Sequence, residues 1–528
     1  MTKDLPMTLV ELLTRKVAAE PDLTILTVVE VNPDGSFSDE RRTYAELMRN
    51  AASLAVTLRG LGVGEGSHFA IMMRNHPEFV EAMIAGIMLG AVFVPIDPRT
   101  MGSKLDYVLR FSECTGVIGT ADCLEAVAGL PDALPDLRWM VHVAGAPAIG
   151  AGGQRLLCFA DAIANDGDIA PIAADPHDPM FMMFTSGTTG NPKGVVMSHA
   201  QYMAYARGRG FGAGPDDRCY TGLSLTHINA QGTLRSGLAH SVPVVMSRKF
   251  TKSRLWDICR AYGCTTFTLL GGMIPEIFSV PPKPDDADNP VRLIISSGMP
   301  RDLWNRYRER FGVEICEGYG STEGGGALVN PPGEGPAGSI GRPFGATEAA
   351  VFDEAGRRCG PNEPGELRFR QQDGKAPRVS YYKNAEASQA KVRDGWFHSG
   401  DIVHYDEDGW FFFHHRVGGG VRRNGDFVNT ALVESVISQS PLVDDVFVYG
   451  VETPGKVAGE KMLVAAVVAA RDADYSEAAL LAHCRAHLER NDVPELFQLL
   501  DAIPKTISEK PIERACIDLL GERGLLPA

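Results

Sequence analysis

A loop rich in glycine and hydroxyl side chains breaks an apolar run in the first half of the chain. Residues 185–190, TSGTTG, combine four hydroxyl side chains with two glycines, and Lys193 follows shortly after. Glycine lets backbone N–H groups approach a bound group, so the loop suits phosphate, and a mobile lysine can follow the charge of a triphosphate. The loop is not of the Walker type, because Gly194 and Val195 follow the lysine. Taken alone, it could equally be a polar hairpin turn.

The surrounding sequence predicts the sheets that would present this loop. From Tyr44 onward, helical patterns alternate with short apolar runs such as HFAIMM and AVFVPID. This alternation predicts parallel sheets covered by helices. The runs FTLLGG, VRLIISSG and VEICEGYG end in glycine, as strands do where their carboxyl ends open onto a ligand crevice.

Two changes of pattern divide the rest of the chain. Between residues 338 and 370, short alternating stretches with glycine and proline predict a small antiparallel sheet or barrel. Residues 417–420, VGGG, predict a flexible joint. We therefore expect an α/β protein with a large N-terminal domain at 1–416, made of parallel helix-covered sheets and a small β-barrel. A hinge at 417–420 and a small mobile α+β C-terminal domain at 421–528 would follow.

The composition argues against several classes of protein. With 528 residues, of which 44% are hydrophobic, the chain is long enough for two or more domains. Its net charge of −15 argues against a general affinity for nucleic acid or anionic membranes. No segment approaches the roughly 20 uncharged apolar residues of a membrane span. The ten cysteines lack metal-site spacing, which is typical of buried thiols in a reducing cytoplasm.

The string TSGTTGNPKGV resembles the phosphate-loop signature of the adenylate-forming superfamily, which includes acyl-CoA synthetases, nonribosomal-peptide adenylation domains and luciferases. Later segments resemble the other motifs of this superfamily in the same order, so the resemblance covers essentially the whole chain. It implies the two-domain fold of the superfamily, in which the C-terminal domain rotates about the hinge between two half-reactions. The 281–300 region is also loosely similar to crotonobetaine/carnitine-type CoA ligases, which favours a short or medium polar acid over a long fatty chain.

The resemblance assigns roles to single residues. In EGYGSTEGG, Tyr319 would stack on adenine, Thr322 would contact the α-phosphate and Glu323 would hold Mg²⁺, since a hard cation prefers carboxylate oxygen. In WFHSGD, Asp401 would bind both ribose hydroxyls. In PKTISEK, Lys510 would neutralise the transition state. The implied ATP-binding and AMP-binding residues are Thr185, Ser186, Gly187, Thr188, Thr189, Gly190, Lys193, Ser297, Gly298, Met299, Glu317, Gly318, Tyr319, Gly320, Ser321, Asp401 and Arg416.

These motifs also have plainer interpretations. GYGSTE could be an ordinary glycine-rich strand exit. Arg416 could be a surface ion pair, and Lys510 a solubilising charge.

A further segment, LTHINAQG, resembles the part of the superfamily that borders the acyl pocket. His227 would orient or gate the acid, although a structural histidine is the alternative. Asn229 and Gln231 indicate a substrate with polar groups, because buried amides need partners. The implied acyl-pocket residues are His227, Ile228, Asn229, Gly320 and Gly325.

The chain departs from the superfamily at two positions. The hinge residue, usually Asp or Lys, is Gly418, which with Gly425 belongs to the implied hinge and CoA region. Glycine there removes a side chain that could stabilise either pose. Glu509 stands where glycine commonly precedes the lysine; it could damp the charge of Lys510, but we expect it to face solvent.

Together these resemblances imply an AMP-forming acyl-CoA synthetase. The enzyme would activate a carboxylic acid with ATP and Mg²⁺, release pyrophosphate, and transfer the acyl group from the adenylate to CoA. The implied catalytic residues are Lys510, Thr322, Glu323 and His227. Two alternatives stay open: an adenylating ligase with another acceptor, such as a carrier protein, an amine or nitrite, and a nucleotide-binding homologue without turnover. We expect a cytoplasmic protein without nucleic-acid partners or a membrane span. The sequence leaves open whether it forms a homodimer.

Overall fold

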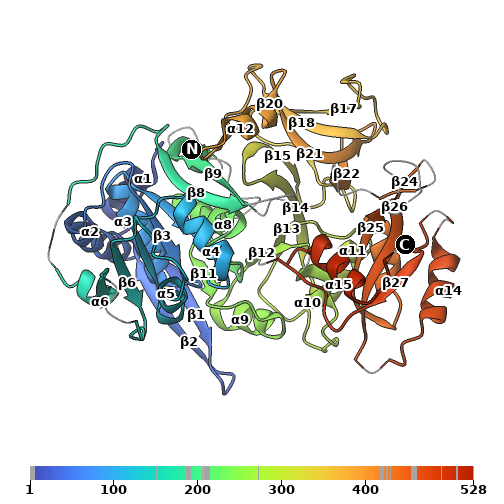
Figure 1. Cartoon of the computed structure of the whole chain (residues 1–528), viewed down its shortest axis with the longest axis horizontal. Coiled ribbons are helices and arrows are strands. Elements are labelled where there is room, and N and C mark those ends of the chain that lie inside the picture. The colour runs from blue at the N-terminus through green and yellow to red at the C-terminus, as the bar shows by residue number, and fades with distance from the viewer. Residues whose placement is uncertain are drawn as a thin grey trace.

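The computed structural model describes residues 6–149, 153–165, 167, 169–185, 192–204, 206, 214–271, 273–416, 421–423, 426–428, 430–452, 461–471, 473–488, 490, 492–506 and 509–526. Figure 1 shows a large α/β part, a curled antiparallel sheet beside it and a small C-terminal domain at one end. The elements that form the candidate site come from all three parts.

The first sheet of the α/β part contains the two strands that flank the predicted phosphate loop. Its strand order is β19-β9-β8-β4-β3-β5-β6-β7, with parallel pairing from β8 through β7 in this order. The strands β8 and β9 pair antiparallel, so the segment between them joins neighbours as a hairpin does. The bounds are β3 (His68–Met72), β4 (Val92–Pro95), β5 (Gly116–Thr120), β6 (Trp139–Val143), β7 (Arg155–Cys158), β8 (Pro179–Thr185), β9 (Lys193–Ser198) and β19 (Ser380–Tyr381).

The second sheet directs glycine-rich strand ends toward the same region. Its order is β16-β15-β14-β13-β12-β10-β11-β1-β2, and the strands from β14 to β1 pair in parallel. The predicted runs FTLLGG, VRLIISSG and VEICEGYG correspond to the neighbouring strands β12, β13 and β14. The bounds are β1 (Thr24–Val31), β2 (Phe37–Thr43), β10 (Cys219–Thr221), β11 (Val244–Ser247), β12 (Thr266–Leu270), β13 (Leu293–Ser297), β14 (Glu314–Ser321), β15 (Gly324–Asn330) and β16 (Arg342–Pro343).

Helices join and cover the two sheets. The helix α3 is apolar on nearly all sides, contacts strands of both sheets and is buried from Phe79 to Met88. A helix that is hydrophobic all round must lie inside the protein, so α3 forms the centre of the main core. The helices are α1 (Leu9–Ala19), α2 (Tyr44–Gly60), α3 (Pro77–Met88), α4 (Gly102–Phe111), α5 (Ala121–Ala128), α6 (Phe159–Ala162), α7 (His199–Ala204), α8 (Ile228–His240), η2 (Lys252–Arg254), α9 (Leu255–Tyr262), α10 (Met273–Phe278) and α11 (Arg301–Phe311).

The antiparallel sheet expected between residues 338 and 370 extends further along the chain, to Arg416. Its strands pair in the order β17-β18-β21-β20, with β22 also paired to β21, and it has its own buried cluster. The bounds are β17 (Thr347–Phe352), β18 (Gly365–Gln371), α12 (Ala385–Lys391), β20 (Val392–Arg393), β21 (Trp396–Tyr405) and β22 (Phe411–Arg416). The longer extent places β21 and β22, with Asp401 and Arg416, beside the end of β14.

The C-terminal domain has apolar clusters of its own on the two faces of a small sheet. The elements are β23 (Val421–Arg423), β24 (Asp426–Val428), α13 (Thr430–Ser438), β25 (Val443–Glu452), β26 (Lys461–Ala469), α14 (Glu477–His487), β27 (Leu496–Leu499) and α15 (Glu513–Glu522). The predicted hinge 417–420, including Gly418, and Gly425 lie outside the described residues. The division at 1–416 and 421–528 therefore stays a prediction.

The observed architecture confirms the predicted fold class, with a curled sheet in the place of the predicted β-barrel. None of the helices in the described ranges combines the length and apolar character needed to cross a membrane.

Candidate active site

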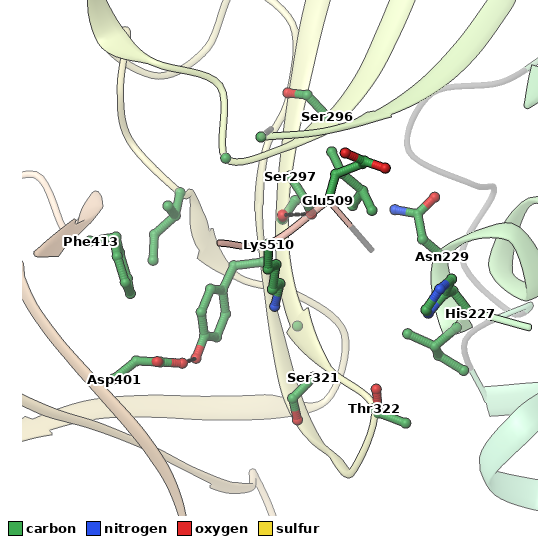
Figure 2. Close-up of a pocket in the computed structure, with 18 of the residues that line it drawn as sticks. His227, Asn229, Ser296, Ser297, Ser321, Thr322, Asp401, Phe413, Glu509 and Lys510 are labelled. Atoms are coloured by element: carbon green, nitrogen blue, oxygen red, sulfur yellow. Dashed lines mark hydrogen bonds between the residues drawn. The ribbon is translucent and has the colours of Figure 1, made fainter. Parts of the chain in front are cut away.

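A cleft of about 2150 Å³ opens where the α/β part, the curled sheet and the C-terminal domain meet. Most of the predicted site residues line it, as Figure 2 illustrates. Those residues are Thr185, Lys193, His227, Ile228, Asn229, Ser297, Gly298, Met299, Glu317, Gly318, Tyr319, Gly320, Ser321, Thr322, Glu323, Asp401, Arg416 and Lys510. The predicted loop residues Ser186, Gly187, Thr188, Thr189 and Gly190 lie outside the described part of the chain.

One predicted pocket residue does not face the cleft. A side chain added at Gly325 would lie 2.4 Å from the ring of Phe397, so this glycine packs against the curled sheet. Its positive φ of 78° also favours glycine for the backbone alone. We therefore correct the assignment of Gly325 to the acyl pocket.

The phosphate end of the cleft combines a cation, a phenol and a carboxylate. Lys193 begins β9, and its ammonium lies 5.5 Å from the centre of the Tyr381 ring. The Tyr381 hydroxyl donates a hydrogen bond of 2.9 Å to Glu323. Burial and the charge of Glu323 raise the pKa of Tyr381, so this hydroxyl stays a donor. The end of the phosphate loop and the predicted metal carboxylate thus lie side by side.

Glu323 fits a magnesium ion that phosphate oxygens also bind. Among the described residues, no group of three or more His, Cys, Asp or Glu side chains could hold a metal ion by itself. Mg²⁺ in nucleotide sites commonly takes one or two carboxylates and completes its shell with phosphate and water. A lone carboxylate at the phosphate end meets that description.

The nucleoside end of the cleft is organised around Asp401. The Tyr319 hydroxyl donates to one carboxylate oxygen of Asp401, and the Arg416 Nε lies 3.2 Å from the other. Asp401 and Arg416 are directly paired across β21 and β22, which explains their contact. Burial and the negative charge of Asp401 raise the pKa of Tyr319. The Tyr319 ring also stacks on Phe369, with 6.1 Å between ring centres.

Glu317 supports the 296–299 loop, the predicted adenine segment. Its carboxyl group accepts hydrogen bonds from the Ser296 hydroxyl and from the backbone N–H groups of Gly298 and Met299. Ser296 and Glu317 are neighbours in the parallel register of β13 and β14. Burial raises the pKa of Glu317 to about 7, although these hydrogen bonds act to lower it. We predicted Glu317 as a nucleotide contact; its geometry makes it a positioning residue for the 296–299 loop.

Lys510 enters the cleft from the C-terminal domain. Figure 2 shows it between the Asp401 side and the His227 side. Its side chain is exposed to the cleft, but the surrounding protein removes bulk water, and this desolvation lowers its pKa. The charge of Arg416 lowers the pKa further, while Asp401 and Glu323 act in the opposite direction. A cation therefore lies within electrostatic reach of both Asp401, the predicted ribose carboxylate, and Glu323, the predicted metal carboxylate.

Ion pairs join residues near Lys510 to other parts of the protein. Lys505 lies 2.8 Å from Asp445 of its own domain and 3.5 Å from Glu276 of the α/β part. Glu509 lines the cleft and lies 3.8 Å from Arg99, with 41% of its side chain exposed. Our expectation that Glu509 faces solvent is met only in part.

The sequence also matches known families. Residues 13–374 match the AMP-binding enzyme model, and residues 432–510 match the model of the AMP-binding enzyme C-terminal domain. The chain belongs to the AMP-binding enzyme family.

Curated relatives of this AMP-binding enzyme match it over nearly their whole length. The medium/long-chain-fatty-acid–CoA ligase FadD17 of Mycobacterium marinum is 29% identical over 513 residues, covering 94% of this chain and 96% of the relative. The steroid-22-oyl-CoA synthetase of Rhodococcus jostii is 29% identical, with coverages of 89% and 86%. The crotonobetaine/carnitine–CoA ligase of Salmonella typhi is 26% identical, with coverages of 89% and 92%. The predicted resemblance to acyl-CoA synthetases is confirmed.

Solved structures share the fold. The anthranilate CoA ligase AuaEII, in complex with anthranoyl-AMP, has a TM-score of 0.86 at 23% identity and full coverage of both chains. A benzoate CoA ligase from Burkholderia xenovorans has a TM-score of 0.80 at 23% identity, covering 97% of this chain and 99% of the other. These similarities confirm the predicted adenylate-forming fold.

The predicted acyl side of this AMP-binding enzyme begins at His227, the residue before α8. Its Nε2 is buried and has no hydrogen-bond partner within the described part of the chain, which favours the site interpretation over a structural histidine. Desolvation lowers its pKa, Asp97 opposes that shift, and the charges of Arg99 and Lys510 reinforce it. His227 is therefore held neutral.

The two amides that follow His227 have different surroundings. Gln231 is fully buried: its amide donates to the Leu225 carbonyl at 2.7 Å and accepts from the Tyr202 hydroxyl at 3.0 Å. This residue is satisfied inside the core, so it carries no information about the substrate, contrary to our expectation. Asn229 lines the cleft, and its Oδ1 is buried with no partner among the described residues.

Lys391 was missed by sequence reasoning. Its ammonium donates to the carbonyls of His398 and Ser399, both at 3.0 Å, and so braces the strand that leads to Asp401. Burial lowers its pKa, while the charges of Glu323 and Asp401 oppose that shift. In the sequence it is only the last residue of a short polar helix, and no local pattern distinguishes it from a surface lysine.

Proposed function

We propose that this chain is an AMP-forming acid–thiol ligase that joins a carboxylic acid to CoA at the expense of ATP. In the first half-reaction, a carboxylate oxygen attacks the α-phosphorus and the bond to pyrophosphate breaks. In the second, the CoA thiol attacks the acyl carbon, loses its proton, and AMP leaves with the former carboxylate oxygen. The CoA-ligase names of the relatives, which match over nearly their whole length, support this assignment.

The observation that carries the proposal is the convergence on one cleft of residues from distant segments. Tyr319 and Asp401 meet at the nucleoside end, Lys193 and Glu323 at the phosphate end, and Lys510 lies between them and His227. Carboxylate attack on a phosphate brings two anions together, so the main catalytic need is positive charge and orientation. Mg²⁺ held by Glu323 and the phosphates would supply part of that charge.

The residues of the chain divide the remaining work. Asp401, fixed by Tyr319 and Arg416, would hold the ribose hydroxyls, and the 296–299 loop, fixed by Glu317, would lie along the adenine. Thr322 would bond the α-phosphate, and Lys510 would pair with the incoming carboxylate and the phosphate as charge develops. Neutral His227 would orient the acid at the pocket entrance.

No protein nucleophile is required by this chemistry. The cysteines are free, and all except the half-buried Cys158 are buried. Burial raises the pKa of thiols such as Cys114, Cys219 and Cys316, which keeps them protonated. These free, unreactive thiols support our proposal of a cytoplasmic location.

We also propose that residues 1–416 and 421–528 are two domains that move about 417–420. The separate apolar clusters of the C-terminal domain support this division. Rotation would withdraw Lys510 once the adenylate has formed and clear the cleft for the thiol. A homodimeric assembly stays a prediction, which light scattering of the purified protein can test.

Exchange of labelled pyrophosphate into ATP over a panel of carboxylic acids tests the first half-reaction. We expect exchange that depends on one class of acid and on Mg²⁺. Loss of free CoA thiol with the same acid then tests the second half-reaction. Exchange and hydroxylamine trapping without thiol loss would point to another acceptor, and ATP binding without any exchange would point to a homologue without turnover.

A further inference from the structure

The acyl side of the cleft contains a buried arginine. Arg235 lies on α8, is only 6% exposed and lines the cleft together with His227 and Asn229. Its guanidinium stands over the ring of Tyr202, 4.8 Å from the ring centre. A guanidinium stacked on an aromatic face is fixed in orientation, and its N–H groups radiate in its own plane toward neighbours at its edge.

Gly232 opens the space in front of this guanidinium. A Cβ atom at position 232 would lie 3.5 Å from Nη2 of Arg235, so a longer side chain there would cover the arginine. Asn229, Gly232 and Ser236 follow at helical spacing on one face of α8, and all three line the cleft. The absent side chain at 232 thus leaves the arginine as part of the cleft wall.

The two described elements beside Arg235 contribute polar side chains and no acid to the cleft. The helix α8 and the neighbouring strand β12 contain no Asp or Glu, and they contribute the hydroxyls of Thr233, Ser236 and Thr268 to the cleft. The acids on the cleft that manage the chemistry have partners elsewhere: Glu323 accepts from Tyr381, and Asp401 binds Tyr319 and Arg416. No negative side chain on α8 or β12 therefore offsets the positive charge of Arg235.

A purely apolar acyl chain is poorly matched to such a wall. It would offer no acceptor to the Arg235 guanidinium and no donor to the buried Oδ1 of Asn229. Desolvating polar groups without compensation is unfavourable. An acid with oxygen acceptors at its far end would accept hydrogen bonds from the guanidinium, and a carboxylate pairs with a guanidinium best of all.

We propose that Arg235 is a specificity-determining residue that binds a second carboxylate, or an equivalent oxygen acceptor, at the far end of the acid substrate. The inference deepens the proposed function and rests on it. The preferred substrates are therefore dicarboxylic or oxo acids in which only one carboxylate is activated. Lys510 and His227 would lie at the reacting carboxylate, and Arg235 at the distal acceptor. Asn229, on the same helix between His227 and Arg235, adds a polar side chain to the same wall.

Pyrophosphate exchange with acids of matched length tests this assignment in the full chain. The pairs are butyrate and succinate, hexanoate and adipate, octanoate and suberate, and benzoate and isophthalate. For at least one pair we expect kcat/KM to be tenfold or more higher for the diacid. Arg235→Met should reduce that ratio at least tenfold, mainly through the KM of the diacid, and leave exchange with the monoacid within about threefold.

Two further variants separate recognition from folding. Gly232→Leu retains the arginine but covers it, so it should also lose the preference for the diacid. Arg59→Met, at an exposed position at the end of α2, is the matched control and should retain the wild-type ratio. Thermal melting with and without ATP reports whether each variant folds and binds nucleotide.

The outcomes distinguish this proposal from the proposed function. Active exchange with monoacids only, or a diacid preference that survives both Arg235→Met and Gly232→Leu, would overturn the role of Arg235 and leave the ligase assignment intact. Absence of exchange with every acid in the panel, in wild-type protein that binds ATP, would count against the ligase assignment itself.

Discussion

The hydroxyl of Tyr319 donates a hydrogen bond to the carboxylate of Asp401, 82 residues further along the chain. One residue ends a parallel strand of the α/β part, and the other lies in the curled sheet. Their contact brings together the ring predicted to stack on adenine and the carboxylate predicted to bind ribose. Arg416 binds the other carboxylate oxygen, so the position of Asp401 is fixed before any ligand arrives.

We expect Asp401→Asn to impair recognition of ribose specifically. An amide offers one acceptor oxygen where the carboxylate offers two, and it loses the charge-assisted bonds to both hydroxyls. The KM for ATP should rise at least tenfold, which corresponds to about 1.4 kcal/mol. Pyrophosphate exchange with ATP and with 2′-deoxy-ATP measures the effect, because the variant should lose most of the wild-type discrimination between the two. Tyr319→Phe, which removes only the supporting hydrogen bond, should raise the KM less. A variant at position 401 that still discriminates normally would contradict the ribose assignment.

Lys510→Met should stop the first half-reaction and leave the second. Removing a cation aimed at developing charge costs about 10²–10³ in rate, and the KM for ATP should change little because Asp401 and the 296–299 loop are intact. A chemically prepared acyl-adenylate supplied with CoA bypasses the first step and should be used at close to the wild-type rate. Equal loss of both half-reactions would contradict the assignment.

The same lysine should make the rate of adenylation fall at high pH. Desolvation and Arg416 lower its pKa, and the protonated form is the one that neutralises charge. Adenylation should therefore fall as the pH rises through this lowered pKa. Lys510→Arg, whose side chain stays protonated, should shift the limit to higher pH in a pH profile of exchange at saturating ATP.

The sequence predicted the parts of this site that depend on local pattern. Strands that end in glycine are each legible from a few consecutive residues, whereas the role of Glu323 came from a resemblance. The convergence of these strands follows from the rule that parallel strands open at one edge of a sheet. The position of Asp401 was readable only through a resemblance, because nothing in its own segment determines which strand of which sheet lies opposite.

The errors and omissions have a common physical cause. Gly325 and Gln231 have roles set by neighbours distant in the sequence, the Phe397 ring and the Tyr202 hydroxyl. Lys391 binds carbonyls only seven and eight residues away, but the contact depends on how the chain folds back from α12 to β21. Glu317 was placed in the correct region, but its orientation depends on the register between β13 and β14. Register and side-chain direction come from tertiary packing, so a single sequence does not contain them in readable form.

Glu317 should make the stability of the protein depend on pH near neutrality. Burial raises its pKa from 4.5 to about 7, so the folded state holds a proton that the unfolded state releases between these values. The stabilisation is therefore complete below pH 4.5 and is lost as the pH rises through 7. Each pKa unit corresponds to about 1.4 kcal/mol, which gives roughly 3 kcal/mol in total. Thermal melting between pH 5 and 8 should show wild type losing stability relative to Glu317→Gln.

Glu434 provides a matched control for this prediction. It is a second buried carboxyl group with a pKa raised to about 7, and it accepts a hydrogen bond from the Val448 N–H in the C-terminal domain. Glu434→Gln should change the pH dependence of melting but not the KM for ATP. Glu317→Gln should also raise that KM, because a single amide oxygen cannot accept from both Gly298 and Met299 as the carboxylate does. A Glu317 variant with unchanged KM would contradict its role in holding the adenine loop.

The pair of Glu509 and Arg99 should couple only weakly. The side chains of Glu509 and Arg99 are 41% and 56% exposed and lie 3.8 Å apart, so solvent screens their charges. A double-mutant cycle with Arg99→Met and Glu509→Gln, measured by urea unfolding, should therefore give a coupling energy of less than about 1 kcal/mol. Glu509 also has a φ of 57°, a left-handed backbone that costs a non-glycine residue about 1 kcal/mol or more. Glu509→Gly should consequently match or exceed the wild-type stability, despite the loss of the ion pair. If adenylation falls more than tenfold in both Glu509 variants while Arg99→Met retains it, the carboxylate acts on Lys510 or on the acid, and the ion pair is incidental.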